Sequence, residues 1–325
     1  MSAPIRERVV TTAGAELHVV DAGEGPLVVL AHGFPELSYS WRHQIQVLAD
    51  AGYRVLAPDQ RGYGLTSRPD RIEDYDVTAL TGDLIALVDD VDEDQAVFVG
   101  HDWGAILVWQ LALLAPARVA GVVGMSVPFV PRPPMPPTQL LRQALGDAWF
   151  YMLYFQEPGV ADADLGRDPA TTMGRLLAAK MPEDGAAIDP TVMAPDGRGF
   201  VDRIPESDGL PAWLTQDELD HYVAEFTRTG FTGPLNWYRN LDRNWELTAH
   251  LADARVEVPS LFIGGSRDPV LVMSPPANGE PFLDDHRGTV LVPGAGHWVQ
   301  QESPREVNAA LLDFLGGLEL SRSVD

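Results

Sequence analysis

The sequence of 325 residues contains no cysteine and a single lysine, Lys180. Without cysteine, disulfides, thiolate nucleophiles, iron–sulfur clusters and cysteine-bound zinc are all excluded. Covalent chemistry must therefore use an oxygen or nitrogen nucleophile. No stretch approaches the roughly eighteen apolar residues of a membrane-spanning helix, and no apolar run follows the charges of the first eight residues. We expect a cytoplasmic protein with no membrane partner.

Positive charge is scarce. The 23 Lys and Arg residues face 47 Asp and Glu residues, which gives a formal net charge of −24. Because so acidic a surface repels phosphate backbones, nucleic acid is not an expected partner. A hydrophobic content of 45% with 22% charged residues matches a packed globular protein and excludes a disordered chain. We expect a monomer or a homodimer.

Continuous apolar runs alternate with helix-like segments along the first part of the chain. Residues 27–31 and 96–99 are apolar throughout, which is typical of parallel strands buried on both faces. Between such runs, residues 77–91 carry leucine and valine at helical spacing. Strand–helix alternation predicts an α/β fold with a mostly parallel, doubly wound sheet.

This rhythm breaks after the apolar run Val119–Val127. Six prolines fall within Pro128–Pro137, and proline does not continue a strand or a helix interior. A mostly helix-like stretch follows, and the apolar strand pattern returns at Pro259–Gly264. The sequence therefore predicts a core of residues 1–128 and 236–325, with a helical lid of residues 129–235 inserted after the sixth strand.

The segment Gly100-His101-Asp102-Trp103-Gly104 lies between an apolar strand and a helical stretch. Its spacing matches the nucleophile elbow, in which the central residue is usually serine. A turn this sharp needs small neighbours, and it presents its central side chain at a helix N-terminus, where the charged form of a carboxylate is favoured. Asp102 is therefore the predicted nucleophile. The alternative is that Asp102 only caps the following helix.

Two further residues complete the pattern in the required order of nucleophile, acid and histidine. Asp268 follows one apolar strand and His297 follows the next, so both fall where the carboxyl ends of strands meet loops. The alternative interpretation makes them a turn residue and a surface histidine. Agreement of residue type, order and placement favours a catalytic triad.

Hydrolysis of an ester also requires an oxyanion hole. The loop His32-Gly33-Phe34-Pro35 follows the strand at residues 27–31, where this architecture supplies one donor. We expect the backbone N–H groups of Phe34 and Trp103 to be the donors. For His32 and His101, a structural role is favoured over catalysis.

At these motifs the sequence resembles the soluble epoxide hydrolases of the α/β-hydrolase superfamily, over nearly its whole length. His32–Pro35, Asp59–Gly64, Gly100–Gly104 and Gly296–Trp298 also occur in haloalkane dehalogenases, whereas Tyr151–Gly159 and Asn236–Asn240 are similar to lid motifs of epoxide hydrolases in particular. The resemblance implies the α/β-hydrolase fold and conversion of an epoxide and water to a vicinal diol. It also implies that two lid tyrosines point at the nucleophile. The matching positions are Tyr151 and Tyr238, with Tyr154 as a rival to Tyr151.

The chemistry agrees with this assignment. When a carboxylate opens an epoxide, it generates an alkoxide that needs a proton, and tyrosine, with an ordinary pKa of about 10, can supply it at neutral pH. A halide needs no proton. The alternative, a haloalkane dehalogenase, requires N–H donors instead, which Trp149, Trp213 or Trp237 would offer.

Other functions fit the sequence less well. A serine esterase fails because neither Ser126 nor Ser266 has the second glycine of the elbow, and a non-catalytic binding protein of this fold is expected to lack a triad member. The acidic run at residues 89–94 does not fit a calcium loop, and no histidines are paired for a metal, so we expect neither metal nor cofactor. A small hydrophobic epoxide is the expected substrate. The pocket candidates are Phe34, Trp103, Phe129, Met152, Phe155, Trp237, Val270 and Trp298.

Overall fold

The computed structural model describes residues 2–179 and 190–320; residues 180–189 of the predicted lid, including Lys180, lie outside this description. The described residues form one sheet of eight strands in the order β1-β2-β4-β3-β5-β6-β7-β8, parallel except for the β1–β2 and β2–β4 pairs. The strands are β1 (Ile5–Thr12), β2 (Ala15–Ala22), β3 (Leu27–Ala31), β4 (Arg54–Pro58), β5 (Ala96–His101), β6 (Val119–Met125), β7 (Val256–Gly265) and β8 (Leu283–Val292).

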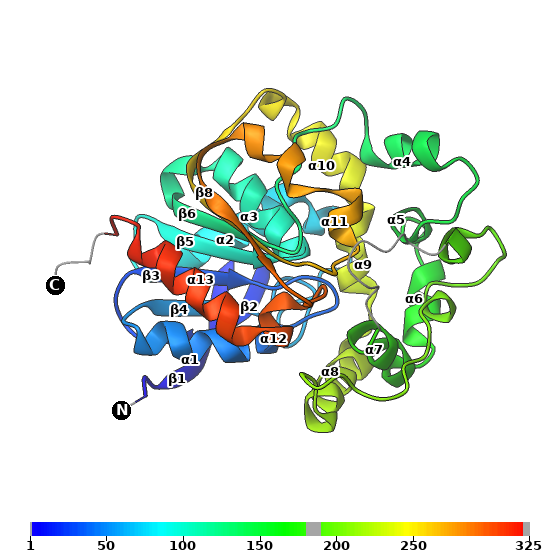
Figure 1. The fold of residues 1–325 in the computed structure, drawn as a ribbon, viewed down its shortest axis with the longest axis horizontal. Coiled ribbons are helices and arrows are strands. Elements are labelled where there is room, and N and C mark those ends of the chain that lie inside the picture. Colours follow the sequence, from blue (N-terminus) through cyan, green and yellow to red (C-terminus); the bar gives the residue numbers. More distant parts are fainter. Residues whose placement is uncertain (1, 180–189, 321–325) are drawn as a thin grey trace.

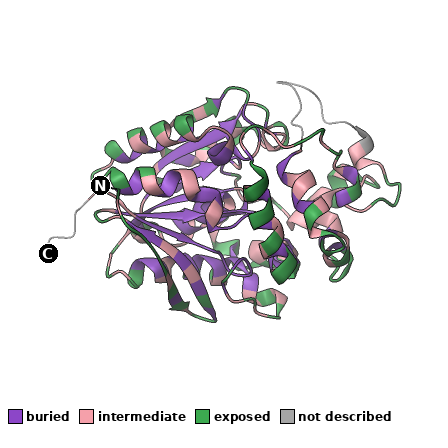
Figure 2. Cartoon of the chain, turned by 90° about the horizontal axis from the view of Figure 1, so that it is seen from below, coloured by how far each residue is buried: buried purple, intermediate pink, exposed green. Residues whose placement is uncertain are grey.

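Helices cover both faces of this sheet (Figure 1). They are α1 (Arg42–Asp50), α2 (Val77–Asp89), α3 (Trp103–Leu114) and α13 (Pro304–Gly316), and the short helices α11 (Val270–Met273) and α12 (Val299–Glu302) follow β7 and β8. Alternate residues of β5 enter separate cores: Phe98 packs in the same core as the apolar residues of α2 and α3, whereas Val97 and Val99 pack with those of α1 and α13. This two-residue alternation explains why the central strands are apolar throughout. Figure 2 shows them buried along their length.

Between β6 and β7 the described chain is helical. Its helices are α4 (Pro137–Leu145), α5 (Tyr151–Tyr154), α6 (Val160–Gly166), α7 (Pro169–Leu177), α8 (Gln216–Thr229), α9 (Thr232–Arg239) and α10 (Leu241–Leu247). Helices α4 to α8 lie to one side of the sheet in Figure 1. Helix α8 also contacts the core, because Glu218 accepts a hydrogen bond from Arg42 at 2.8 Å and the hydroxyls of Tyr222 and Ser40 lie 2.8 Å apart.

The predicted fold class is confirmed. Strand β8 is longer than its sequence suggests, because it begins at Leu283 whereas only residues 289–292 have a continuous strand pattern. Its first half is polar because β8 is an edge strand, paired on one side only and partly exposed. Within residues 2–179 and 190–320, we find no helix with the length and apolar character needed to cross a membrane.

Candidate active site

Asp102 sits on the turn between β5 and α3 in an unusual backbone conformation, with φ 52° and ψ −118°. The turn is possible only with glycine on either side. A Cβ at Gly100 would overlap the backbone of Gly104, and a Cβ at Gly104 would overlap the carbonyl of Ala31 on the adjacent strand β3. Strand, turn and helix therefore hold the Asp102 side chain where β3 and β5 end.

Asp268 and His297 meet Asp102 from the ends of β7 and β8. The Asp268 Oδ2 atom lies 2.9 Å from Nδ1 of His297, and Nε2 of His297 lies 3.5 Å from Oδ2 of Asp102. Asp268 is fully buried, whereas the side chains of Asp102 and His297 keep 16% and 14% of their surface exposed. The structure thus brings the three predicted triad residues together, with His297 between the two carboxylates.

The electrostatics of His297 follow from these two carboxylates. Burial on its own would lower the pKa of His297, but the charges and hydrogen bonds of Asp268 and Asp102 raise it well above 6.5. The pair of carboxylates therefore favours the imidazolium form while Asp102 is ionised.

The predicted oxyanion donors lie on the other side of Asp102. The backbone N–H of Phe34 donates to Oδ1 of Asp102 at 2.8 Å. Trp103 is the first residue of α3, so its N–H has no acceptor within the helix. Gly33 allows this close approach, because a Cβ there would overlap the Asp102 side chain.

A buried carboxylate that the sequence analysis did not single out holds this region together. Glu36 accepts hydrogen bonds from the Gly33 N–H at 2.9 Å and from Gln300 at 2.8 Å, and it lies 2.6 Å from Nδ1 of His101. Burial opposes its charge, but His101 and these bonds lower the pKa of Glu36 to about 2. The other ring nitrogen of His101 lies 2.7 Å from the carbonyl oxygen of His297. In the sequence, only the position of Glu36 three residues after Gly33 could have pointed to this role.

His32 fills the structural role expected of it. It is fully buried, its Nδ1 lies 3.0 Å from the Gly33 carbonyl, and its Nε2 accepts from the N–H of Gln60 at 2.9 Å. These bonds tie the loop after β3 to the loop after β4.

Tyr151 from α5 and Tyr238 from α9 lie next to each other, with ring centroids 6.0 Å apart, and the charge of Asp102 acts on both hydroxyls. The Tyr238 ring also packs edge-on against Trp103 at 5.0 Å and Phe34 at 5.3 Å. Burial, and then the negative charge of Asp102, raises the pKa of both hydroxyls well above 10. Both are therefore protonated donors throughout the neutral range.

Tyr154, the rival of Tyr151, is oriented differently. Its hydroxyl donates to Asp164 at 3.3 Å, and its ring packs against Trp149 at 5.5 Å. Burial and the Asp164 charge raise the pKa of Tyr154 to about 12. The charge of Asp102 raises the pKa of Tyr151, whereas the charge nearest to the Tyr154 hydroxyl is that of its hydrogen-bond partner Asp164.

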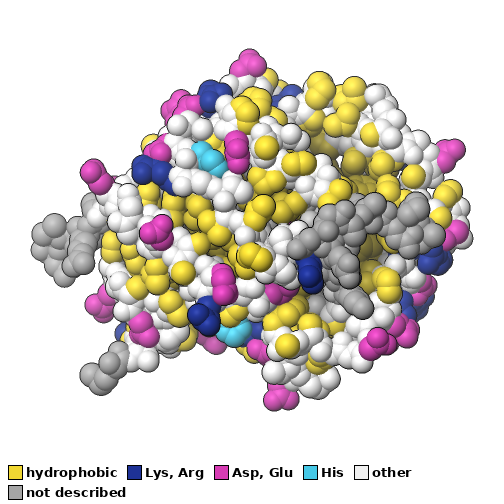
Figure 3. Space-filling model, in the orientation of Figure 1, with side chains coloured by type: hydrophobic (Ala, Val, Ile, Leu, Met, Phe, Trp, Pro, Cys, Tyr) yellow, Lys and Arg dark blue, Asp and Glu magenta, His cyan; other side chains and the backbone are white. Residues whose placement is uncertain are grey.

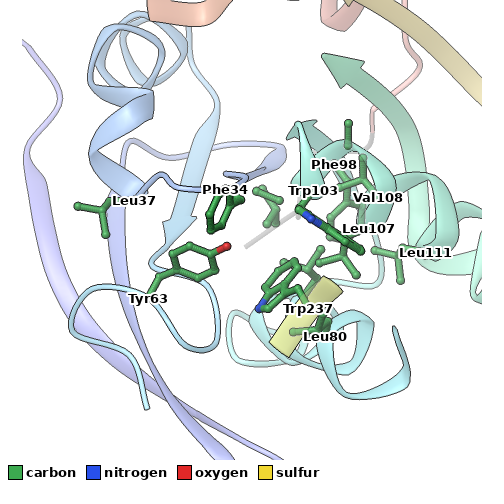
Figure 4. Close-up of a cluster of buried hydrophobic side chains, with 14 of the residues drawn as sticks. Phe34, Leu37, Tyr63, Leu80, Phe98, Trp103, Leu107, Val108, Leu111 and Trp237 are labelled. Carbon is green, nitrogen blue, oxygen red and sulfur yellow. The ribbon is translucent and has the colours of Figure 1, made fainter. Parts of the chain in front are cut away.

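Some of the eight residues predicted to line the pocket lie near Tyr238 and His297, and others do not. Phe34, Trp103 and Phe155 pack around Tyr238, and Trp298 packs against His297 with ring centroids 4.8 Å apart. Figure 4 shows Phe34, Trp103 and Trp237 within one buried cluster.

The remaining candidates have other contacts. Phe129 packs against Trp109, Met152 is only partly buried against the core, and the N–H of Val270 donates to Asp268. Trp237 donates its indole N–H to the carbonyl of Arg61 at 3.0 Å, so that donor is already engaged. Among the described residues, no group of three or more His, Asp or Glu side chains is arranged to hold a metal ion.

Comparisons with known proteins agree with this geometry. A family model for the α/β-hydrolase fold matches residues 26–304. The chain is 58% identical to epoxide hydrolase A of Mycobacterium tuberculosis, over 98% of this chain and all of that protein. The crystal structure of epoxide hydrolase A from Mycobacterium thermoresistibile has a TM-score of 0.94 at 58% identity and covers 98% of this chain and 100% of its own.

A more distant structure gives the same result. The epoxide hydrolase from an endophytic Streptomyces has a TM-score of 0.91 at 42% identity, with 96% of each chain covered. Similarity of this extent includes the helical segment between β6 and β7 as well as the sheet. The chain therefore belongs to the epoxide hydrolases of the α/β-hydrolase fold.

Proposed function

We propose that this protein converts an epoxide and water to a vicinal diol through a covalent ester on Asp102. In the first step Oδ2 of Asp102 attacks an epoxide carbon and the ring C–O bond breaks. The developing alkoxide takes a proton from the hydroxyls of Tyr151 and Tyr238, which hold the epoxide oxygen. A hydroxyalkyl ester remains on the carboxyl group.

The second step hydrolyses that ester. His297, oriented by Asp268, takes a proton from a water molecule that attacks the carboxyl carbon of Asp102. Negative charge then develops on Oδ1, the atom that already accepts a hydrogen bond from the Phe34 N–H. The carbon–Oδ2 bond breaks, His297 returns its proton to the leaving oxygen, and the second water proton restores the tyrosine. The sum is one epoxide and one water to one diol.

One arrangement supports this proposal most: the charge of Asp102 acts on the hydroxyls of two neighbouring tyrosines, while a histidine lies near its Oδ2 and a backbone N–H donates to its Oδ1. The tyrosines supply what an alkoxide needs and a halide does not. The relatives named as epoxide hydrolases support the same reaction. The cytoplasmic location and the choice between monomer and homodimer stay predictions from the sequence.

A single turnover in oxygen-18 water tests the ester. We expect mass spectrometry to find the first label in the Asp102 carboxylate and not in the diol, because water attacks the carboxyl carbon. The variant His297→Gln should accumulate the alkylated protein, whereas Asp102→Asn should form neither ester nor diol. Label that enters the diol directly would refute the covalent route.

Parallel assays separate the dehalogenase alternative. Styrene oxide and 1-bromobutane are supplied to the same preparation, and diol and bromide are measured together. Diol without bromide supports the proposal, whereas bromide release without diol would establish dehalogenation instead.

A further inference from the structure

A cavity of about 140 Å³ lies on the lid side of Tyr151. Its walls come from three stretches of the lid, residues 149–151, 192–193 and 200–204, and from Met273 at the end of α11. On the face shown in Figure 3 the surface is hollowed between lid and core, and hydrophobic side chains predominate there. Of the residues that the sequence analysis singled out, only Tyr151 and Trp149, the latter as an N–H donor in the dehalogenase alternative, are among the described residues that line this cavity.

Two of the residues that line the cavity connect it to the proposed reaction centre. Tyr151 forms part of its wall, and the charges of Asp102 and Asp268 act on the hydroxyl of the same residue. Helix α11 supplies Met273 and begins at Val270, whose N–H donates to Asp268 at 2.9 Å. An epoxide whose oxygen is held by Tyr151 therefore has this space beside it for its substituent.

The lining is almost wholly apolar although it includes an arginine. Arg203 is buried, and its nitrogens donate to the carbonyls of Val192 at 2.9 Å and Arg198 at 3.2 Å and to Asp196 at 2.8 Å. The flat face of its guanidinium lies 4.1 Å from the ring centroid of Trp149. Arg203 is thus satisfied by protein acceptors, and it positions Trp149 as a wall of the cavity.

The volume of the cavity and the aromatic rings in its walls indicate which substituent fits. The volume is close to the roughly 150 Å³ of an engineered apolar cavity in another protein that binds benzene. The Trp149 and Phe200 rings are stacked with centroids 6.3 Å apart, and the Phe200 ring lies 6.0 Å from that of Tyr151. Aromatic walls of this kind favour an aromatic guest, because ring pairs gain energy beyond the area that they bury.

We propose that this cavity is the subsite for the substituent of the epoxide and that its size selects an oxirane carrying one aromatic ring. Arg203 acts as a positioning residue for Trp149 in the wall. The inference rests on the proposed function and adds the substrate class to it.

The test compares three oxiranes with methyl, phenyl and 2-naphthyl substituents. We expect kcat/KM of the protein to be highest for the phenyl compound, above the methyl compound by about tenfold or more because a ring is buried. Ile204→Phe fills the cavity, so it should lower the phenyl-to-methyl ratio about tenfold while the methyl rate stays within about threefold. Met193→Ala enlarges the cavity and should raise the rate with the naphthyl compound relative to phenyl.

The matched control is Ile85→Phe, the same exchange at a partly buried isoleucine of α2, which should leave the phenyl-to-methyl ratio unchanged. If both cavity variants leave the ratios unchanged, or lower all rates in parallel, the subsite is refuted while diol formation through the ester still stands. A naphthyl preference in the unaltered protein refutes the one-ring size. If no oxirane yields diol, and His297→Gln forms no ester with any of them, the proposed function itself fails.

Discussion

At the scale of single residues, the two oxygens of Asp102 have different surroundings and so different tasks. Oδ1 accepts the Phe34 N–H, and Oδ2 faces His297. In the proposed reaction, Oδ2 forms the bond to carbon and Oδ1 carries the negative charge during hydrolysis. The backbone donor is therefore in place before any charge develops, which is the condition for electrostatic preorganisation.

The lid tyrosines give a residue-scale prediction. Tyr238→Phe removes one donor to the alkoxide, so the rate of ester formation should fall about 100-fold or more. Rapid quenching followed by mass spectrometry measures the alkylated protein directly. Tyr154→Phe is the control, since its hydroxyl bonds to Asp164, and its ester formation should stay within about twofold of the unaltered protein. Equal losses in the two variants would contradict the assigned roles.

Residues differ in how well the sequence predicts them. Asp102, Asp268 and His297 each follow an apolar strand, so chain order alone suggested that they meet. Glu36 and Arg203 have no such signal, because their roles depend on His101, Gln300 and Trp149, which are distant in sequence. A buried charge is recognised only when its partners are known.

At the scale of elements, the turn from β5 to α3 is held by close contact with β3. Gly104→Ala places a methyl group against the Ala31 carbonyl, so we expect a loss of about 1–3 kcal/mol in the free energy of unfolding together with reduced ester formation. Denaturant titration and the alkylation assay measure the two effects.

The control is Gly82→Ala in the interior of α2, where an added Cβ has no neighbour within 4 Å. There the exchange should raise stability by about 0.5–1 kcal/mol, because alanine is the better helix former. Full stability and full activity in Gly104→Ala would show that the turn tolerates a side chain.

The elements themselves were predictable to different degrees. Strand β3 is apolar at all five positions because both faces are covered, and its boundaries match the expected run of residues 27–31. The first half of strand β8 is polar at the edge of the sheet, and only its last four residues gave a continuous strand signal. Burial on both faces, and not strand formation as such, produces the clear pattern.

At the scale of the whole molecule, the proposed chemistry is divided between the strand ends of the sheet and the helices that lie between β6 and β7 in the chain. The strand ends hold Asp102 and His297, whereas α5 and α9 bring Tyr151 and Tyr238. His297 therefore limits ester hydrolysis at low pH, and the tyrosines limit ester formation at high pH.

The pH dependence of the two steps follows from the directions in which the pKa values of His297, Tyr151 and Tyr238 are shifted. Ester hydrolysis needs neutral His297, so its rate should rise with pH as the imidazole loses its proton. Because esterification removes the Asp102 charge that raises the pKa of His297, this rise should occur at lower pH than the titration of His297 in the free protein. Ester formation needs protonated tyrosines, whose pKa values lie above about 10, so its rate should stay level up to that pH.

Rapid quenching across the pH range measures both steps separately. The chemical shifts of His297 ring carbons, followed by NMR in the free protein, report its own titration. A fall in ester formation between about pH 8 and 9 would contradict the raised tyrosine pKa values.

The pocket marks the limit of prediction at this scale. The fold class followed from alternation along the chain, but the cavity is formed by three separate stretches between β6 and β7 and by α11. Its volume depends on how these segments approach one another, which hydrophobic periodicity does not encode. Loop-like segments such as residues 200–204 can therefore be assigned to the substrate pocket only once the structure is known.

The conformation of Asp102 also bears on how such enzymes diversify. The turn fixes the position of its Cα and Cβ through contacts of Gly100 and Gly104, and these contacts do not involve the carboxylate. The same elbow accommodates serine in many other hydrolases of this fold. A single codon change can thus replace the attacking atom without rebuilding the backbone. Evolution between reaction types on this scaffold is then limited by the lid and its donors, and much less by the nucleophile.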